Sequence, residues 1–526
     1  MLTPHTAFEK LRKIIRPQHI TAFIAALVTG IIAHGYVIMN YIPNWDGFNN
    51  LYDAQNKPEL GRCFLTLSCG ISSYYDLPWI SGLLSILYIS LTAAILVQIL
   101  RLTRTASCIF TGAILASFPA VTSIMGYSYT SDGYFLAMLL MTIAVYLSIQ
   151  KKSGILRCVP AAGLVCIALG TYQAFLAFAL MIILVWTVKY LLFDLDGEIT
   201  EVTGSTPSDM KYFALCMRNF AVSFGIGFIA YIICSKVLQI VQGVTAADYQ
   251  GINEVGSFSI SGFISGFGRA LVDFTYYYVG SLSKLGLYGL LNIFLTIILA
   301  GSIVFFIVKK KIYKEPLRLI ILILAIAMMP FACFAIHFVS GGVSYHSLMI
   351  MGMSLIFVML AVMYEQFGAP LYKWLVIVLL SVVVWNYVLI ANICYRVEET
   401  SVTRSMAVLD DIADAIAEEG AQSATNLIVV GSWDENETGR FSSSSSINLP
   451  PEITGFTDGI IMTGANHFAN LLNDYYGYDY RILAKATEQE YMGVHEEEIR
   501  TMPEYPENGC VSVIDNVVVI KLSGVK

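Results

Sequence analysis

One carboxylate stands out by its place in the chain. Asp46 lies in the aromatic and amide-rich segment Tyr41–Asn50, directly after the first long apolar run, residues 20–39. An acid placed where a chain leaves a membrane is a candidate for chemistry at the lipid–water boundary. The alternative interpretation is an ordinary interfacial loop, because Trp and Tyr collect at the level of the lipid headgroups in any case.

Other polar side chains lie at the predicted outer ends of later apolar runs. They are aromatic, amide, hydroxyl, imidazole and carboxylate groups, with almost no lysine. The set consists of Asn44, Trp45, Tyr129, Asp132, Tyr172, Gln173 and His346. Aromatic rings stack on the apolar faces of a sugar ring, while amides and carboxylates bind its hydroxyls. The pattern favours a sugar site, in which Asp46 is the general base that takes the proton of an acceptor hydroxyl.

Asp132 and Arg62 each have two interpretations. Asp132 would orient sugar hydroxyls or act as a second carboxylate, but Ser131–Gly133 directly before an apolar run is also typical of a helix N-cap. Arg62 is one of few predicted outer cations and would hold a phosphate leaving group through its bidentate fork, with Arg269 as a weaker candidate. The alternative for Arg62 is a headgroup contact. His346 binds a ligand or is an ordinary polar residue at a span end.

The composition indicates that these residues are positioned by membrane spans. The chain has 526 residues, of which 56% are hydrophobic and 13% are charged, whereas soluble domains carry roughly a quarter of charged residues. A span needs roughly 20 apolar residues. The sequence predicts about eleven spans, at residues 20–39, 79–100, 107–125, 133–150, 155–170, 174–193, 214–240, 285–308, 317–336, 347–364 and 372–394.

Lysine and arginine predict the orientation of these spans. They are concentrated in alternate loops, and such loops face the cytoplasm. This places the N-terminus in the cytoplasm, the C-terminus outside, and two long loops, residues 40–78 and 241–284, on the outer face. The spaced Phe and Ile side chains of residues 256–268 predict an interfacial helix followed by a re-entrant turn. The net charge of -7 gives no indication of nucleic-acid binding.

The composition changes after the last apolar run. Val402–Glu419 has helical periodicity, Asn426–Gly431 is typical of a buried strand, and Val511–Leu522 is typical of two strands around an Asp515–Asn516 turn. The sequence therefore predicts a membrane domain over residues 1–395 and a small extracytoplasmic α/β domain over residues 396–526. No Cys/His cluster has zinc-ligand spacing, so no metal site is predicted.

Several of these motifs, in this order, resemble a known family. They are Asn44–Phe48, Gly61–Arg62, Asp76–Trp79 with Gly82–Ser85, Ser131–Tyr134, Gly170–Gln173 and Val513–Ile520. Together they are similar to the bacterial O-antigen glucosyltransferases of the serotype-converting type. The resemblance covers most of the chain and is strongest between residues 40 and 180.

The resemblance implies a polytopic, all-α membrane transferase with a GT-C-like fold. Such enzymes take glucose from a polyprenyl phosphate on the outer face of the bacterial inner membrane and transfer it to a lipid-linked O-antigen repeat or a related surface glycan. An acidic catalytic residue in the first outer loop maps to Asp46, and inversion in a single displacement is implied. The implied partners are membrane lipid, the lipid-linked donor, the glycan acceptor, a flippase and a donor-making synthase. No cofactor is predicted to be required, and the sequence leaves a divalent metal open.

Two other functions share part of this pattern. A glycan polymerase or ligase also has many spans and outer loops, but it usually needs more outer arginines to hold pyrophosphate-linked chains. A flippase or transporter of lipid-linked sugars would have charged residues deep in its spans and inverted repeats. The predicted spans of this chain are nearly uncharged, which argues against a transporter.

Overall fold

The contacts of the chain divide it into two units. The computed structural model describes residues 15–150, 156, 158–195, 210–247, 260–279, 287–338, 346–432, 453–457, 459–462 and 464–523, together with residues 3, 5, 6, 9 and 12. The helical unit comprises Met1–Asn40, Asp53–Asn392 and Pro450–Thr454. The sheet unit comprises Tyr41–Tyr52, Ile393–Leu449 and Gly455–Lys526. The segment that carries Asp46 therefore belongs to the sheet unit, and the boundary expected at residue 396 stays a prediction.

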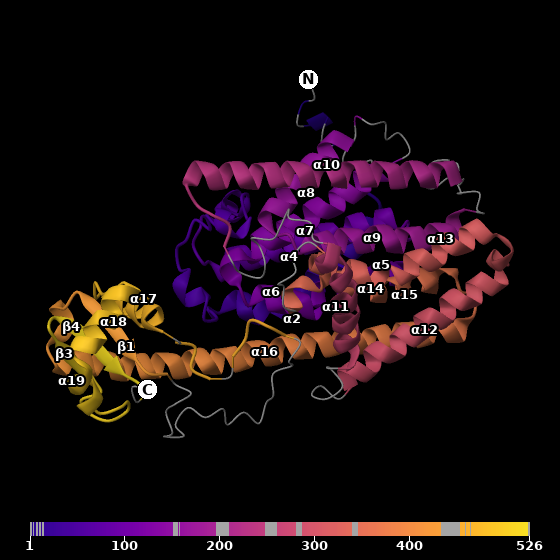
Figure 1. The fold of residues 1–526 in the computed structure, drawn as a ribbon. Coiled ribbons are helices and arrows are strands. Elements are labelled where there is room, and N and C mark those ends of the chain that lie inside the picture. Colours follow the sequence, from indigo (N-terminus) through magenta and orange to yellow (C-terminus); the bar gives the residue numbers. More distant parts are fainter. Residues whose placement is uncertain are drawn as a thin grey trace. The chain divides into compact units, whose positions relative to one another are not determined.

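The helical unit is built almost entirely of apolar helices (Figure 1). Its elements are α2 (Pro17–Met39), η2 (Pro58–Leu60), α3 (Leu65–Cys69), η3 (Gly70–Ser72), α4 (Pro78–Ile99), α5 (Thr105–Ser117), α6 (Pro119–Met125), α7 (Ser128–Ser148), α8 (Cys158–Thr171), α9 (Phe175–Lys189), η5 (Tyr190–Asp194), α10 (Met210–Gln242), α11 (Ile260–Val279), α12 (Leu287–Lys309), η9 (Ile312–Lys314), α13 (Pro316–Ala327), α14 (Met329–Cys333), η10 (Ala335–Phe338), η11 (Ser347–Met349), η12 (Met351–Met353), α15 (Ser354–Gln366) and the first part of α16 (Pro370–Glu418). Proline opens α2, α4, α6 and α13, since its fixed φ suits the first helical position, where no N–H is needed.

Length and hydropathy make this a multi-pass membrane protein. In the described part of the chain, 8 helices are long and apolar enough to cross a membrane, and the count is 9 if α5 and α6 form one span with a 42° bend. Pro119 lies at that bend, where its ring disfavours helical geometry for the preceding residue. The predicted apolar segments all coincide with helices, but α8 and the helix over residues 351–366 are short. The predicted count of about eleven spans is therefore not confirmed.

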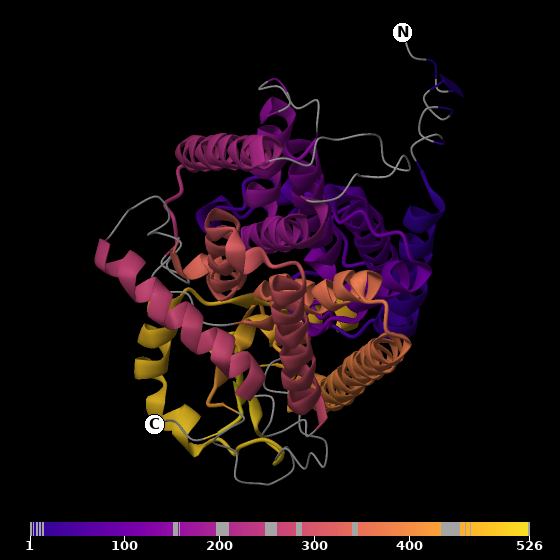
Figure 2. The same ribbon diagram turned by 90° about the vertical axis from the view of Figure 1, so that its right-hand side faces the viewer.

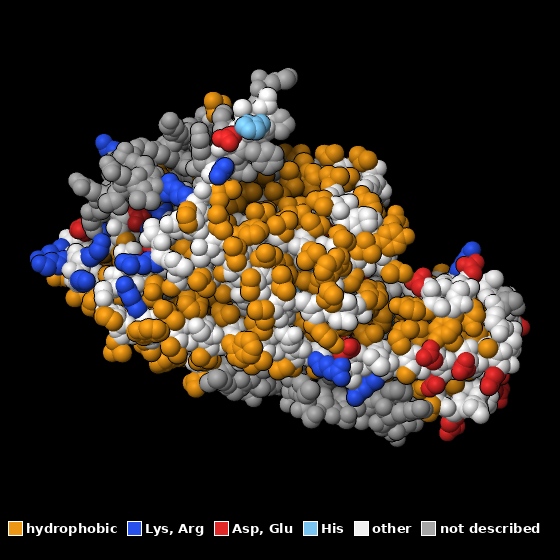
Figure 3. Space-filling view, turned by 180° about the vertical axis from the view of Figure 1, so that it is seen from behind, with side chains coloured by type: hydrophobic (Ala, Val, Ile, Leu, Met, Phe, Trp, Pro, Cys, Tyr) orange, Lys and Arg blue, Asp and Glu red, His pale blue; other side chains and the backbone are white. Residues whose placement is uncertain are grey.

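Small residues allow close packing inside the helical unit. Helix α2 packs on α4 and α5, and α10 packs on α8. A Cβ atom on Gly112 would lie 2.3 Å from the carbonyl oxygen of Ala22, and one on Gly227 would lie 2.7 Å from that of Ala162. Such contacts between backbones are typical of helix pairs in membranes. Figure 3 shows hydrophobic side chains covering one face of this unit, as a surface in contact with lipid requires.

The outer loop expected over residues 241–284 is described only in part. Residues 248–259 and 280–284 lie outside the described residues, which leaves the predicted re-entrant turn untested. Helix α11 occupies Ile260–Val279 and exposes apolar side chains such as Ile264, Leu271 and Val272. A helix with such a face suits the membrane interface.

The sheet unit has one small mixed sheet. Its elements are η1 (Gly47–Asn49), the end of α16, η13 (Ala421–Ser423), β1 (Asn426–Val430), α17 (Ala465–Tyr476), β2 (Arg481–Ile482), α18 (Lys485–Val494), α19 (Glu496–Thr501), β3 (Val511–Ile514) and β4 (Val517–Lys521). The strand order is β2-β1-β4-β3, with β1 parallel to both of its neighbours. Strands β3 and β4 form a hairpin around Asp515 and Asn516, whose φ angles of 44° and 63° are those of a type I′ turn. The predicted strands and turn are confirmed.

The helix predicted over Val402–Glu419 is the end of α16. This helix runs for 49 residues from Pro370 without a break (Figure 2, orange). It ends at Glu418, and Gly420 then turns the chain with a φ of 67°, a left-handed conformation that glycine adopts at little cost.

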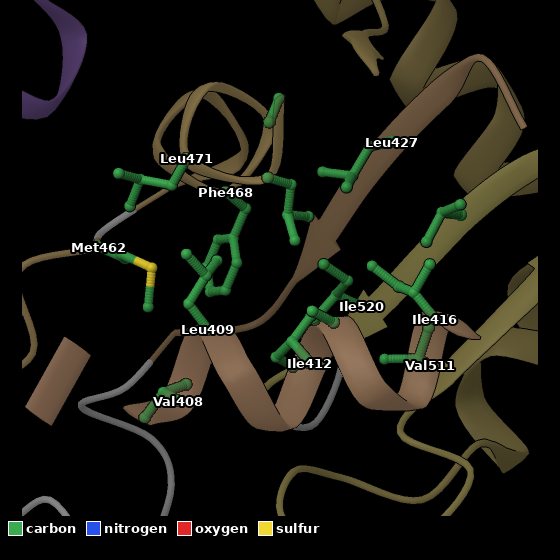
Figure 4. Close-up of a cluster of buried hydrophobic side chains, with 14 of the residues drawn as sticks. Val408, Leu409, Ile412, Ile416, Leu427, Met462, Phe468, Leu471, Val511 and Ile520 are labelled. Atoms are coloured by element: carbon green, nitrogen blue, oxygen red, sulfur yellow. The ribbon is translucent and has the colours of Figure 1, made fainter. Parts of the chain in front are cut away.

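The core of the sheet unit includes the segment around Asp46. Figure 4 shows Phe468 of α17 directed toward Leu409 and Ile412 of α16, beside β-strand side chains. Phe48 is 4% exposed and belongs to the same cluster, and Trp45 packs against it. The segment is therefore an integral part of this core and not a free loop.

Replacing Phe48 with Ala is expected to destabilise the sheet unit by about 3–5 kcal/mol, the usual cost of removing a buried aromatic ring. Thermal unfolding of the purified protein in detergent measures the effect. The control is Tyr52→Ala, since Tyr52 lies in the same segment but is 61% exposed. Equal destabilisation by the two substitutions would show that Phe48 does not anchor the segment.

Candidate functional site

One arginine of the helical unit lies against two stacked tyrosines. Arg62 Nη1 donates a hydrogen bond to Tyr134 Oη at 2.8 Å. The rings of Tyr134 and Tyr172 stack with centroids 3.9 Å apart. The guanidinium carbon of Arg62 lies 5.6 Å and 5.7 Å from their two centroids, within the range of cation–π attraction. We call these three residues the arginine cluster.

A glycine allows the chain to bring Arg62 to this place. Gly61 ends η2 with a φ of 68°, and a Cβ atom there would lie 2.7 Å from Tyr231 Oη and 3.0 Å from Gln173 Nε2. Only glycine combines this backbone conformation with so little space. The next turn is fixed by the N–H of Phe64, which donates to the carbonyl oxygen of Gly170 at 2.7 Å.

Gln173 links this loop to a third element. Its Nε2 donates to the carbonyl oxygen of Leu60 at 3.1 Å and to Tyr231 Oη at 3.0 Å. Of the predicted residues, the structure thus brings together Arg62, Tyr172 and Gln173. Tyr134 and Tyr231 were not predicted. Tyr231 could have been found, because its phenol lies inside an apolar span, where a polar group is energetically costly and often has a function.

Asp132 lies on the same helix as Tyr134. It is 1% exposed, and neither carboxyl oxygen accepts a hydrogen bond from a described residue. Helix α7 begins at Ser128 with Tyr127 at its N-cap, so the alternative that Asp132 merely caps the helix is wrong. The charges of Asp132 and Arg62 both act on the buried thiol of Cys69: burial raises the pKa of Cys69, Asp132 raises it further and Arg62 opposes the rise. Asp132 is therefore close to the arginine cluster.

Asp76 is a second buried carboxyl group, which the sequence did not single out as a site residue. It lies before α4 and is 4% exposed. Burial raises the pKa of Asp76 to about 7, and a hydrogen bond from the hydroxyl of Ser128 opposes the rise. A buried carboxyl group favours its neutral form, because the charge of its ionised form is poorly solvated.

The Asp76→Asn variant is expected to be more stable than the natural protein above pH 7. The folded state binds the Asp76 proton more tightly than the unfolded state does. The free energy of unfolding of the natural protein therefore falls as the pH rises from about 4 to about 7, and this contribution is constant above that range. The expected increase in the free energy of unfolding of the variant is on the order of a few kcal/mol at pH 8 and small at pH 4. Thermal unfolding at both pH values measures it, and a gain that does not depend on pH would contradict the assignment.

Asp46 and its neighbours form a separate group in the sheet unit. Asp46 is half-buried and precedes η1, and its carbonyl oxygen accepts hydrogen bonds from Asn49 N at 3.1 Å and Asn50 Nδ2 at 2.6 Å. Asn44 is fully buried. Its Oδ1 accepts from Gly47 N at 2.9 Å, and its Nδ2 donates to the carbonyl oxygen of Gly455 at 3.4 Å. Asn44 therefore holds the backbone of the segment.

The other three predicted residues have contacts elsewhere. Arg269 lies on α11, where its Nη2 donates to the carbonyl oxygen of His337 at 3.4 Å. The ring of Tyr129 packs against Tyr127, with centroids 6.3 Å apart. His346 precedes η11, and burial lowers its pKa. These contacts do not bring them together with Arg62.

Two further polar pairs involve histidines that are not among the predicted site residues. His337 Nε2 lies 2.5 Å from Asp273 Oδ2, and His467 of α17 pairs with Asn49. Both pairs join residues far apart in the sequence, and no local pattern marks them. In the described part of the chain, no group of three or more His, Cys, Asp or Glu residues is arranged to hold a metal ion.

Comparison with known proteins identifies the family of the helical unit. The family model described as glucosyl transferase GtrII matches residues 35–364, which is more than half of the chain. The match includes the arginine cluster, Asp46 and Asp132. No curated protein and no solved structure matches the chain.

Proposed function

The chain belongs to the GtrII glucosyl transferase family, and from this premise we propose that it moves glucose from a polyprenyl phosphate to a lipid-linked O-antigen repeat or another surface glycan. Family membership makes it a membrane glycosyltransferase. The donor, the inverting course and the roles of individual residues are parts of the proposal. So are the GT-C-like fold, the bacterial inner membrane and the orientation, with a cytoplasmic N-terminus and an extracytoplasmic C-terminus.

The arginine cluster is the observation that carries the choice of donor. A sugar linked to a lipid phosphate leaves a phosphate monoester anion behind, and its developing charge needs a fixed cation. Arg62 is held by one hydrogen bond and two aromatic rings. A guanidinium presents planar N–H groups that match a phosphate in a bidentate manner.

Asp46 is the proposed general base of the transfer step. The oxygen of an acceptor hydroxyl forms a bond to C1 of glucose as the bond from C1 to the phosphate oxygen breaks. The electron pair leaves with the polyprenyl phosphate, and the hydroxyl proton passes to the carboxylate of Asp46. One displacement inverts C1, so a β-linked donor gives an α-linked product without a covalent enzyme intermediate.

The remaining candidates have supporting roles in this proposal. Asp132 is a buried carboxyl group beside the arginine cluster and would accept hydrogen bonds from sugar hydroxyls. Tyr172 and Gln173 hold Arg62 and its loop. A flippase and a donor-making synthase are the proposed functional partners, because lipid-linked glucose has to be made and brought to the outer face.

The configuration of the product tests the proposal. Purified protein in liposomes is given β-linked polyprenyl-phosphate glucose, ¹³C-labelled at C1, and an acceptor glycan. We expect an α-linked glucosyl product in the NMR spectrum. A β-linked product would contradict a single displacement. Movement of the labelled lipid across the bilayer without a new bond would indicate a flippase, and extension of a pyrophosphate-linked chain would indicate a polymerase or ligase.

A further inference from the structure

His467 contacts the segment of Asp46 at two points. It lies on α17, one residue before the core residue Phe468 that Figure 4 shows, and is 6% exposed. Its Nε2 lies 2.8 Å from Asn49 Nδ2, and the imidazole also forms a hydrogen bond with the backbone of Trp45. These two contacts are on opposite sides of Asp46 in the sequence.

The hydrogen bonds define which nitrogen of His467 carries the proton. Asn49 Oδ1 accepts a hydrogen bond from Asn470 Nδ2 at 3.0 Å, which leaves Asn49 Nδ2 as the donor toward His467. Nε2 must therefore accept, so the neutral ring carries its proton on Nδ1. This N–H donates to the carbonyl oxygen of Trp45. The imidazole thus connects the carbonyl oxygen of Trp45 with the side-chain N–H of Asn49, four residues later in the chain.

Burial favours this neutral form. Burial lowers the pKa of His467, while the Trp45 carbonyl and the charge of Asp46 oppose the change. Asp46 is the charged group that acts on His467 from the segment packed against it.

We propose that His467 is a positioning residue that holds Trp45 and Asn49, and through them Asp46, in the geometry needed for proton transfer. The inference rests on the proposed role of Asp46 as the base. It gives the sheet unit a part in catalysis through α17. His467 itself does not need to touch the substrate.

The bridge predicts an acid limit for activity. Protonation of His467 places a hydrogen on Nε2, which then faces the N–H donor of Asn49 and can no longer accept. Because burial lowers the pKa of His467, this loss occurs at a lower pH than it would for an exposed histidine. Activity is therefore expected to fall on the acid side as His467 becomes protonated.

Two variants break the bridge from opposite sides. His467→Leu removes both hydrogen bonds, and Asn49→Leu removes one of them at an exposed position, where folding is little affected. Each is expected to lower kcat by about 10- to 100-fold with an unchanged KM for the lipid-linked donor, since small misplacements of a catalytic group are costly. The double variant is expected to be no worse than His467→Leu alone, because both act on one interaction.

His495→Leu is the matched control. His495 lies in the same unit, where its nitrogens face Glu498 and Asp515, and its replacement is expected to leave kcat unchanged. The acid fall in activity is expected to move to lower pH in both His467→Leu and Asn49→Leu, since the base Asp46 is still present in each. A kcat in these variants equal to that of His495→Leu, or an acid fall at an unchanged pH, would overturn the positioning role.

The proposed function can fail separately from this inference. If Asp46→Asn retains transfer, the base assignment itself is wrong. If Asp46→Asn is inactive while His467→Leu and Asn49→Leu are fully active, the base assignment stands and only the positioning role is lost.

Discussion

Replacing Asp46 with Asn is expected to lower the rate of glucosyl transfer by about 10²–10⁴-fold, the usual contribution of a general base. The amide keeps the size of the side chain but has no site to take the proton of the acceptor hydroxyl. The hydrogen bonds that hold the segment use the backbone of Asp46 and the side chain of Asn44, so the fold should survive. Transfer of labelled glucose in membranes with matched expression measures the loss.

Asp53→Asn provides the control for this substitution. Asp53 comes directly after Tyr41–Tyr52, the segment that belongs to the sheet unit. It forms an ion pair with Lys57 at 2.8 Å, and a partly exposed ion pair contributes little to stability. Its replacement is expected to leave transfer nearly unchanged. Equal rates for Asp46→Asn and Asp53→Asn would remove Asp46 from the mechanism.

The second large effect is expected for Arg62→Ala. This variant should lower kcat/KM for the lipid-linked donor by about 100-fold or more, because it removes the cation that stabilises the leaving phosphate. Dependence of the rate on acceptor concentration should change much less. Arg62→Lys should recover only part of the loss, since an ammonium keeps the charge but lacks the planar guanidinium that lies near the rings of Tyr134 and Tyr172 and can bind a phosphate with two hydrogen bonds.

Lys57→Ala is the matched control for Arg62, because it removes another cation from the same loop. Steady-state kinetics with donor and acceptor varied in turn separate the two effects. A similar loss for donor and acceptor in Arg62→Ala would contradict a phosphate role. It would indicate that Arg62 maintains the structure of the loop.

Features governed by local rules could be predicted from the sequence. Apolar runs predicted the helices of the helical unit, and the Asp515–Asn516 turn predicted the hairpin because both residues tolerate a positive φ. The order of the motifs predicted the family. The continuation of α16 beyond its apolar part is not predicted, because the change to polar residues from Arg396 onward is also typical of a new domain. Residues 393–418 contain no Gly or Pro to end a helix.

Features made by long-range contacts could not be predicted. Phe48 packs with residues of α16 and α17, and Asn49 pairs with a histidine 418 positions away; no periodicity in the sequence carries such information. The grouping of Arg62 with Tyr172 and Gln173 was partly predictable, since alternate loops share one membrane face. The stacking of Tyr134 on Tyr172 depends on the packing of α7 and α8, and the sequence alone does not specify that packing.

The identity of the donor is the central claim, and one measurement tests it most directly. Purified protein in liposomes is offered acceptor glycan with radiolabelled glucose, linked either to polyprenyl phosphate or to a nucleotide. We expect label to reach the glycan only from polyprenyl phosphate, with one molecule of polyprenyl phosphate released for each glucose transferred. Transfer from the nucleotide-linked sugar in the absence of the lipid, or no transfer from the lipid, would contradict the account.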